Sequence, residues 1–232
     1  MVSPLRSLRT AWRRLLRVGT STLDGIRLIT AKDRISNVVI NGIFKETYEE
    51  PEKILIRAAL RPGDRVLEVG GGVGFISLLC AKIVGADNVL TYEANPAMQE
   101  VILANYQLND LAPTLRVRAV TAHGGDITLF VNTNIVSSSF YHREGGGAAI
   151  VPSDALDAVL AEWRPTVLVM DVEGAEVDIL SASALAGLRA LILELHPHIV
   201  GNEALVSMRG HLAKHGFRES RALQKSVLFL RS

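Results

Sequence analysis

The sequence predicts an α/β fold with a doubly wound, mostly parallel sheet that ends in an antiparallel terminal hairpin. Three observations lead to this prediction. From residue 65 onward, short apolar runs alternate with longer helical patterns, as in a sheet covered by helices. The apolar runs are almost continuous, which is typical of parallel strands buried on both faces. A glycine-rich turn follows the first run directly, where folds of this class bind nucleotides.

The composition of the 232-residue chain is that of a globular protein with one large domain. Its formal net charge of +1 argues against a dedicated nucleic-acid-binding surface. The single cysteine, Cys80, excludes an internal disulfide framework, and we expect it to be a buried apolar residue. No apolar run reaches the roughly 18 residues of a membrane span, and arginines interrupt the N-terminal segment where a signal peptide would be apolar. These features favour a cytoplasmic location.

Two regions are expected: an N-terminal extension over residues 1–50 and the main domain over residues 51–232. In the extension, residues 5–17 show an amphipathic helical pattern of leucines, Trp12 and arginines. This helix would act as a lid or docking element; the alternative is weak contact with an anionic membrane surface, without stable insertion. Residues 25–44 are expected to form a small hairpin, because apolar runs alternate there with turn residues.

The main domain begins with a helix that opens near Tyr48, with Pro51 in its first turn, a position that suits proline. The expected strands follow at 65–70, 88–94, 115–121, 126–132, 166–171 and 190–194. The expected helices lie at 73–85, 96–108, 154–163, 175–187 and 202–215. Residues 123–152 interrupt the alternation and are expected to form an inserted hairpin with a glycine-rich tip. The terminal hairpin is expected around Phe217 and residues 227–230.

The glycine-rich turn lies in the run R-V-L-E-V-G-G-G-V-G-F over residues 65–75. Its glycines allow a sharp turn and close approach of a ligand. A dinucleotide fingerprint needs a glycine where Phe75 stands, which disfavours a hydride-transferring dehydrogenase. Glu68 would repel a pyrophosphate but suits the positively charged amino group of S-adenosylmethionine. The predicted cofactor contacts in this run are Glu68, Gly70, Gly72, Val73 and Gly74.

A second predicted cofactor contact follows the next strand. The run Asn88–Asn95 ends in Glu93, which lies 25 positions after Glu68. In doubly wound folds an acid at about this distance from the glycine turn binds ribose hydroxyls. S-adenosylmethionine has a free 2′,3′-diol, so the Glu93 carboxylate could accept both hydrogens. We expect Glu93, Ala94 and Asn95 to contact the cofactor.

These motifs resemble those of the FkbM family of S-adenosylmethionine-dependent methyltransferases. The likeness covers about residues 45–200, and its most specific part is the sequence V-M-D-V-E-G-A-E at 169–176. Supporting pieces are Tyr48-Glu49, the turn at 61–64, the serines at 137–139 and the L-E-L-H sequence at 193–196. The resemblance implies a class I methyltransferase fold, with S-adenosylmethionine as cofactor. It also implies methylation of an oxygen of a sugar or secondary metabolite.

Asp171 is the first catalytic candidate, because it follows a core strand at the edge where ligands of open α/β sheets bind. Its carboxylate could accept a proton from a hydroxyl, hold the acceptor, or balance the charge of the cofactor. The alternative is a turn-capping carboxylate before the helix that opens at Gly174. His196 follows the next strand and titrates near neutrality, so it is the second candidate base. The alternative for His196 is a structural or solvated loop residue.

Three acids follow the strands that carry these candidates. Asp171, Glu173 and Glu194 could gather a divalent cation, but their spacing matches no metal motif, and no metal is expected. Glu176 is expected to be a first-turn acid favoured by the helix dipole.

The leading functional hypothesis is therefore an O-methyltransferase that acts on a small-molecule acceptor, without a nucleic-acid partner. One alternative methylates nitrogen or a carboxylate of a small molecule or peptide. Another is a catalytically silent cofactor-binding domain that recognises a partner through residues 5–17. Substrate contacts are expected from residues 1–50 and from the insertion, for which His142 is a candidate. The sequence leaves the acceptor and the oligomeric state undecided.

Overall fold

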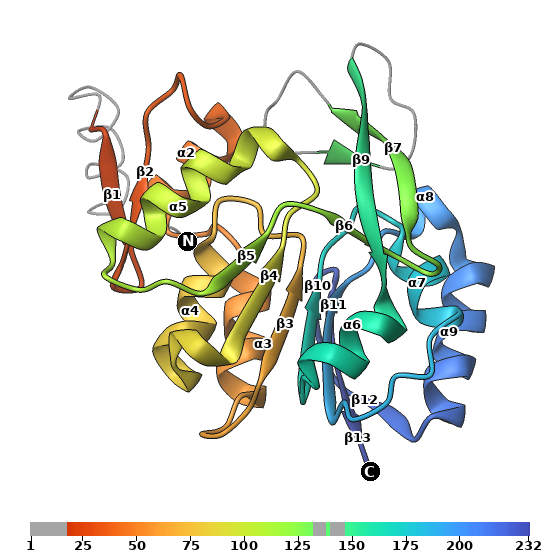
Figure 1. Ribbon diagram of the computed structural model, residues 1–232. Helices are drawn as coiled ribbons and strands as arrows, with labels where there is room; N and C mark the ends of the chain where they lie inside the picture. The colour runs from red at the N-terminus through yellow and green to blue at the C-terminus, as the bar shows by residue number, and fades with distance from the viewer. Residues whose placement is uncertain (1–17, 132–137, 140–146) are drawn as a thin grey trace.

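The computed structural model describes residues 18–131, 138–139 and 147–232 (Figure 1). The helix expected at residues 5–17 lies outside this part of the chain, and so do the tip of the insertion and His142. In the described part of the chain, no helix combines the length and the apolar character needed to cross a bilayer.

A seven-stranded, mostly parallel sheet forms the centre of the molecule, as the sequence predicts. Its strands, in spatial order, are β12 (Phe217–Leu223), β13 (Ser226–Arg231), β11 (Ala190–Glu194), β10 (Val167–Met170), β3 (Val66–Val69), β4 (Val89–Tyr92) and β5 (Thr114–Arg116). The strands from β11 to β5 pair in parallel, whereas β12 and β13 form the predicted antiparallel hairpin. The chain runs outward from β3 through β4 to β5 and then returns to β10 on the other side. The strand order therefore reverses between β3 and β10, and ligands of such sheets bind at the carboxyl ends beside this point.

Helices cover both faces of the sheet (Figure 1). On one face lie α3 (Glu50–Ala59), α4 (Phe75–Val84) and α5 (Gln99–Leu108). On the other face lie α6 (Leu156–Trp163), α7 (Glu176–Ser181) and α9 (Asn202–Lys214). Three short elements lie between helices and strands: η1 (Ala86–Asn88), η2 (Pro96–Met98) and α8 (Pro197–Val200). The sequence did not predict η1 or α8.

Successive side chains of each strand point to opposite faces, and this alternation decides where the polar groups lie. On β3, Val66 belongs to the core beneath α3 and α4, whereas Leu67 belongs to the core beneath α6 and α7. By the same alternation Glu68 lies on the α3–α4 face. Asp171 and Glu194 lie on that face too, because Asp171 comes two positions after Val169 and Glu194 two positions after Ile192, and both of these residues belong to the core beneath α3 and α4.

The N-terminal extension differs from the sequence prediction. The hairpin consists of β1 (Thr20–Leu23) and β2 (Ile26–Ile29), and the run expected to supply its second strand forms α2 (Asn37–Lys45) instead. The turn of the hairpin is Asp24-Gly25, with φ of 51° and 76°, a dipeptide that favours tight hairpins. Ser36 begins α2 by accepting a hydrogen bond from the Val39 backbone N–H at 3.4 Å.

The prediction of a single strand at 115–121 is also wrong, because this segment contains parts of two short strands that belong to different sheets. β5 ends at Arg116, and β6 (Ala119–Thr121) joins a second sheet in the order β6-β9-β7-β8. The remaining strands of that sheet are β7 (Gly125–Val131), β8 (Ser138–Ser139) and β9 (Gly147–Ala155). β7 and β9 pair in antiparallel fashion, so the predicted inserted hairpin is confirmed. The helix expected at 175–187 ends earlier, at Ser181.

Candidate active site

A cavity of about 280 Å³ lies at the carboxyl ends of the central strands, beside the point where the strand order reverses. The glycine turn forms its floor, and residues from the segment before α3 and from β6 and β7 form its walls. The lining residues used below are Tyr48, Glu49, Glu52, Glu68, Gly70, Gly72, Glu93, Ala94, Arg118, Asp171, Glu173 and Glu194. Four of the predicted site residues do not line the cavity: Val73, Gly74, Asn95 and His196. The first three are sequence neighbours of lining residues, and the His196 ring lies 3.8 Å from Asp171, which lines the cavity.

The glycines of the turn serve different purposes. A side chain on Gly70, whose φ is 101°, would bring a Cβ within 2.0 Å of the Asp171 carbonyl oxygen. A Cβ on Gly74 would lie 3.0 Å from Tyr106, so this glycine permits the packing of α4 against α5. Gly72 has a φ of 55°, and a Cβ there would meet only the Tyr48 hydroxyl, at 3.4 Å. Gly72 is therefore the glycine that leaves space on the cavity side.

Glu68 is buried beneath the glycine turn with 1% of its surface exposed. Its Oε2 accepts a hydrogen bond from the Thr91 hydroxyl at 2.7 Å. Its Oε1 has no hydrogen-bond partner among the described residues. Burial raises the pKa of Glu68 to about 8, although the nearby hydroxyls of Thr91 and Ser77 lower it in part. A cationic group in the cavity would stabilise the ionised carboxylate.

Glu93 connects the end of β4 to the glycine turn. Its Oε2 accepts a hydrogen bond from the Gly72 backbone N–H at 2.8 Å, and its Oε1 accepts one from the Asn95 N–H at 2.7 Å. Each carboxylate oxygen has two lone pairs, so one acceptor position remains on each. Burial raises the pKa of Glu93 to about 7. The Asn95 side chain accepts from the Ala97 N–H at 3.1 Å and so begins η2.

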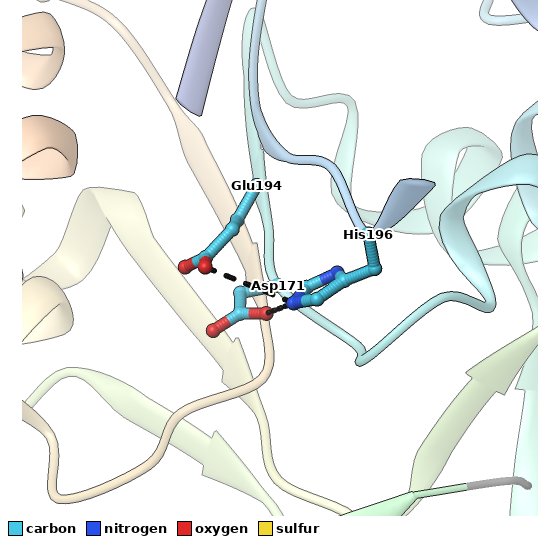
Figure 2. A group of neighbouring side chains, drawn as sticks. All are labelled: Asp171, Glu194 and His196. Atoms are coloured by element: carbon cyan, nitrogen blue, oxygen red, sulfur yellow. Dashed lines mark ion pairs between the residues drawn. The ribbon is translucent and has the colours of Figure 1, made fainter. Parts of the chain in front are cut away.

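Asp171, Glu194 and His196 converge at the ends of β10 and β11 (Figure 2). His196 Nε2 lies 3.8 Å from Asp171 Oδ1 and 3.7 Å from Glu194 Oε1. Glu173 Oε2 lies 3.9 Å from the same nitrogen. Burial and the negative charges of Glu194 and Glu49 raise the pKa of Asp171 well above its usual range. The two predicted catalytic residues are therefore neighbours.

Glu176 holds the His196 ring from the opposite side. Its Oε1 accepts a hydrogen bond from the Val172 N–H at 2.9 Å and lies 3.2 Å from His196 Nδ1. Both side chains are buried, with 1% and 3% exposed. Burial acts to lower the pKa of His196, but the hydrogen bond and negative charge of Glu176, together with the charges of Glu173 and Glu194, outweigh it and raise that pKa. Beyond the first-turn role expected from the sequence, Glu176 thus orients His196 with Nε2 toward Asp171.

The sequence predicts substrate contacts from residues 1–50, but it singles out none of the residues directly before α3 as part of the site. Glu49 lies there with a φ of 49°, a left-handed conformation that is uncommon for a residue with a side chain. Burial, together with the charge of Glu52, raises the pKa of Glu49 to about 8, while a hydrogen bond with Tyr48 lowers it in part. The pair Tyr48-Glu49 is also part of the family resemblance, and these two signals are what the sequence offers for this wall.

The cavity is lined by many more acidic than basic residues. Among its described lining residues, Arg118 is the only cation, and Asp154 holds that guanidinium at 2.7 Å. Seven of these lining residues are carboxylic acids: Glu49, Glu52, Glu68, Glu93, Asp171, Glu173 and Glu194. A ligand with positive charge is therefore favoured over a pyrophosphate.

This architecture, with the glycine turn and the cavity beside the strand reversal, is that of the class I methyltransferases. The chain belongs to the FkbM methyltransferase family, whose domain model matches residues 45–219. The match covers both predicted catalytic residues and all predicted cofactor contacts. No curated protein sequence matches the chain significantly.

Solved structures agree with this fold at low sequence identity. Magnesium protoporphyrin IX methyltransferase from Synechocystis PCC 6803, with bound SAM, is 17% identical, with 98% of this chain and 95% of that chain covered and a TM-score of 0.53. A methyltransferase from Pyrococcus furiosus is 14% identical, with 99% of both chains covered and a TM-score of 0.51. TYW2 from P. horikoshii, in complex with MeSAdo, is 12% identical, with 97% and 80% covered and a TM-score of 0.51.

Proposed function

We propose that this protein transfers a methyl group from S-adenosylmethionine to a hydroxyl of a sugar or secondary metabolite. The observation that carries the proposal is the acidic cavity above the glycine turn, at the carboxyl ends of the strands. When bound, S-adenosylmethionine would supply a methyl group that its sulfonium already activates. The protein must then align the acceptor and exclude water.

The cofactor assignment rests on the chemistry of the residues around the turn. Glu68 supplies a buried carboxylate suited to an amino group, and Gly72 leaves space beside it. Glu93 has one acceptor position left on each oxygen, as a ribose diol requires. Ala94 would lie against the nucleoside. The remaining predicted contacts, Val73, Gly74 and Asn95, would act by fixing the shape of the turn. The solved neighbour with bound SAM supports the same cofactor.

The acceptor assignment rests on Asp171 and His196. Asp171 Oδ1 is buried without a hydrogen-bond partner among the described residues, so it is available to accept a proton or hold a hydroxyl. His196 Nε2 lies 3.8 Å from that oxygen and could share the proton. A base of this kind matters most when the acceptor is a hydroxyl, which favours oxygen over nitrogen as the methylated atom. We infer a small-molecule acceptor, because the cavity has a volume of only about 280 Å³.

The first test is the titration of S-adenosylhomocysteine by calorimetry, with NAD as the comparison ligand. We expect micromolar binding, about −8 kcal/mol, for S-adenosylhomocysteine and none for NAD. Tight NAD binding without S-adenosylhomocysteine binding would refute the cofactor assignment. Transfer of labelled methyl to candidate hydroxyl, amine and carboxylate acceptors then decides which atom is methylated. A protein that binds the cofactor but methylates none of these classes would support the silent binding domain instead.

A further inference from the structure

The group Asp171, Glu194 and His196 has the composition of a metal-binding site. Each residue offers one ligand atom, and these three atoms lie within 4.8 Å of one another. Figure 2 shows the two carboxylates and the imidazole edge directed toward a common point. An acidic cluster alone would not identify a site, since exposed acids often gather without a ligand. Two further observations distinguish this cluster.

The first observation is the state of His196 Nε2. The ring is 97% buried, as its exposed fraction is 3%, and Nε2 is directed into the cluster. Its neighbouring carboxylate oxygens lie at 3.7 to 3.9 Å, too far for hydrogen bonds, which require about 2.7 to 3.2 Å. Ligand atoms about 2.1 Å from one cation lie roughly 3 to 4 Å apart. The separations therefore suit a shared cation better than direct hydrogen bonds.

The second observation is the contact behind the ring. Glu176 Oε1 lies 3.2 Å from His196 Nδ1 and fixes the ring orientation. Metal-binding histidines almost always use their other nitrogen in this way, because a carboxylate partner holds the proton there and leaves the opposite lone pair for the metal. Asp171 Oδ1 adds a buried acceptor atom without a hydrogen-bond partner among the described residues. The orienting carboxylate and the unpartnered oxygen both point to a bound cation.

We propose that Asp171, Glu194 and His196 bind one divalent cation with nitrogen and oxygen ligands, such as Mn²⁺ or Zn²⁺. One imidazole with two carboxylates suits these ions better than Ca²⁺ or Mg²⁺, which prefer oxygen alone. A second acidic group, Glu49, Glu52 and Glu194, contains no histidine and is not part of the proposal. The sequence predicts no metal, because the spacing of Asp171, Glu173 and Glu194 matches no metal motif. Spacing along the chain does not reveal that His196 meets Asp171 and Glu194.

The role of the cation rests on the proposed function, whereas the binding site does not. The three residues lie at the strand ends that also border the cofactor cavity, and Asp171 and Glu194 line it. A cation there would bind an oxygen of the acceptor and lower the pKa of its hydroxyl. Asp171 and His196 would then position the acceptor through the metal, and the proton of the hydroxyl would pass to solvent water instead of to these side chains. This restricts the substrates to acceptors with an accessible oxygen ligand.

The experiment is a titration of the chelator-treated full-length protein with Mn²⁺ alone. Calorimetry measures the heat of binding, and electron paramagnetic resonance measures the free Mn²⁺. We expect one site per chain in the wild type. Asp171→Asn, Glu194→Gln and His196→Ala should each weaken Mn²⁺ binding at least tenfold. Glu203→Gln and His123→Ala are the matched controls, because both residues are exposed, and both should bind like the wild type. Circular dichroism identifies any variant that fails to fold. If His196→Ala fails to fold, the isosteric variants Asp171→Asn and Glu194→Gln still test the site.

Absence of Mn²⁺ and Zn²⁺ binding in the wild type would overturn the proposal, and so would equal binding in all three cluster variants. A second arm repeats the Mn²⁺ titration with saturating S-adenosylhomocysteine. We expect both to bind together. Displacement of Mn²⁺ would overturn the proposal, because the carboxylates would then belong to the cofactor. Mn²⁺ binding by a protein that does not bind S-adenosylhomocysteine would support the cation site and contradict only the proposed function.

Discussion

Glu93 accepts a hydrogen bond from the Gly72 backbone N–H at 2.8 Å, so the carboxylate at the end of β4 fixes the shape of the glycine turn. The same carboxylate is the proposed ribose ligand. The two roles are connected, because the bond from Gly72 positions Glu93 and leaves its other lone pairs for a ligand. A substitution of Glu93 therefore removes both the ribose contact and the support of the turn.

Glu93→Ala should weaken S-adenosylhomocysteine binding at least tenfold, since each lost hydrogen bond to a charged group costs about 1.5 to 3 kcal/mol. Glu93→Gln keeps one acceptor oxygen and should show a smaller loss. The control is Glu100→Ala, which removes an exposed acid from α5. Calorimetric affinities of the three variants test this order. Equal affinity of Glu93→Ala and the wild type would remove Glu93 from the cofactor site.

The regular part of the fold could be predicted because its signals are local. Apolar runs that alternate with helical patterns gave the parallel strands, and the glycine turn with Glu93 gave the position of the cavity. The errors occurred where a local signal is ambiguous. The run Asn37-Val-Val-Ile suits a strand or a buried helix turn, and only the Ser36 cap and the packed side chains decide for α2. Residues 115–121 contain no breaker strong enough to show that β5 and β6 separate.

The chemistry around His196 could not be predicted for a different reason. Glu176 and His196 are 20 positions apart, and they meet only because α7 and the loop after β11 pack at the same end of the sheet. The left-handed conformation of Glu49 is likewise imposed by its surroundings, not by its residue type. Contacts of this kind depend on tertiary packing, for which a single sequence has no local signal.

The stability of the cofactor-free protein should fall as the pH rises from 5 to 9. Burial raises the pKa of Glu68 to about 8, so the folded state holds a proton that the unfolded chain has already lost above about pH 4.5. The stabilisation is complete below the unfolded pKa and is lost as the pH rises through the folded pKa. The total change from this group is on the order of a few kcal/mol.

Thermal unfolding across this pH range measures the effect. Glu68→Gln should make the dependence less steep, because glutamine does not titrate, whereas Glu49, Glu93 and Asp171, whose pKa values are also raised, should retain part of it. Glu100→Gln should leave the dependence unchanged. S-adenosylhomocysteine should restore stability at high pH if its amino group pairs with the ionised Glu68. An unchanged pH profile in Glu68→Gln would show that another group controls the transition.

Asp171→Asn should reduce the single-turnover rate about 100-fold or more, at saturating cofactor, once an acceptor is known. The amide removes the negative charge but keeps the shape of the side chain. If Asp171 acts on the acceptor, S-adenosylhomocysteine affinity should remain close to the wild type. If it balances the charge of the cofactor, affinity should fall together with the rate.

Two variants complete this test. His196→Ala should show a smaller rate loss than Asp171→Asn, and Asp178→Asn, which alters an exposed acid on α7, should show none. A wild-type rate for Asp171→Asn would mean that this carboxylate has a structural role only.

The two glycines at 70 and 72 should respond differently to alanine. A Cβ on Gly70 would lie 2.0 Å from the Asp171 carbonyl oxygen, in a conformation with φ of 101°. Because that oxygen belongs to the backbone at the end of β10, the contact cannot be relieved by a side-chain rotation. Gly70→Ala should therefore destabilise the protein by at least about 2 kcal/mol.

A Cβ on Gly72 would meet only the Tyr48 hydroxyl, at 3.4 Å, so the main cost there is the left-handed backbone, about 1 kcal/mol. That Cβ would, however, occupy the cavity floor, so Gly72→Ala should weaken S-adenosylhomocysteine binding more than it weakens the fold. Urea unfolding and calorimetry of both variants separate the two effects. The reverse order, with Gly72→Ala unstable and Gly70→Ala defective only in binding, would contradict the assignment of Gly72 to the ligand side of the turn.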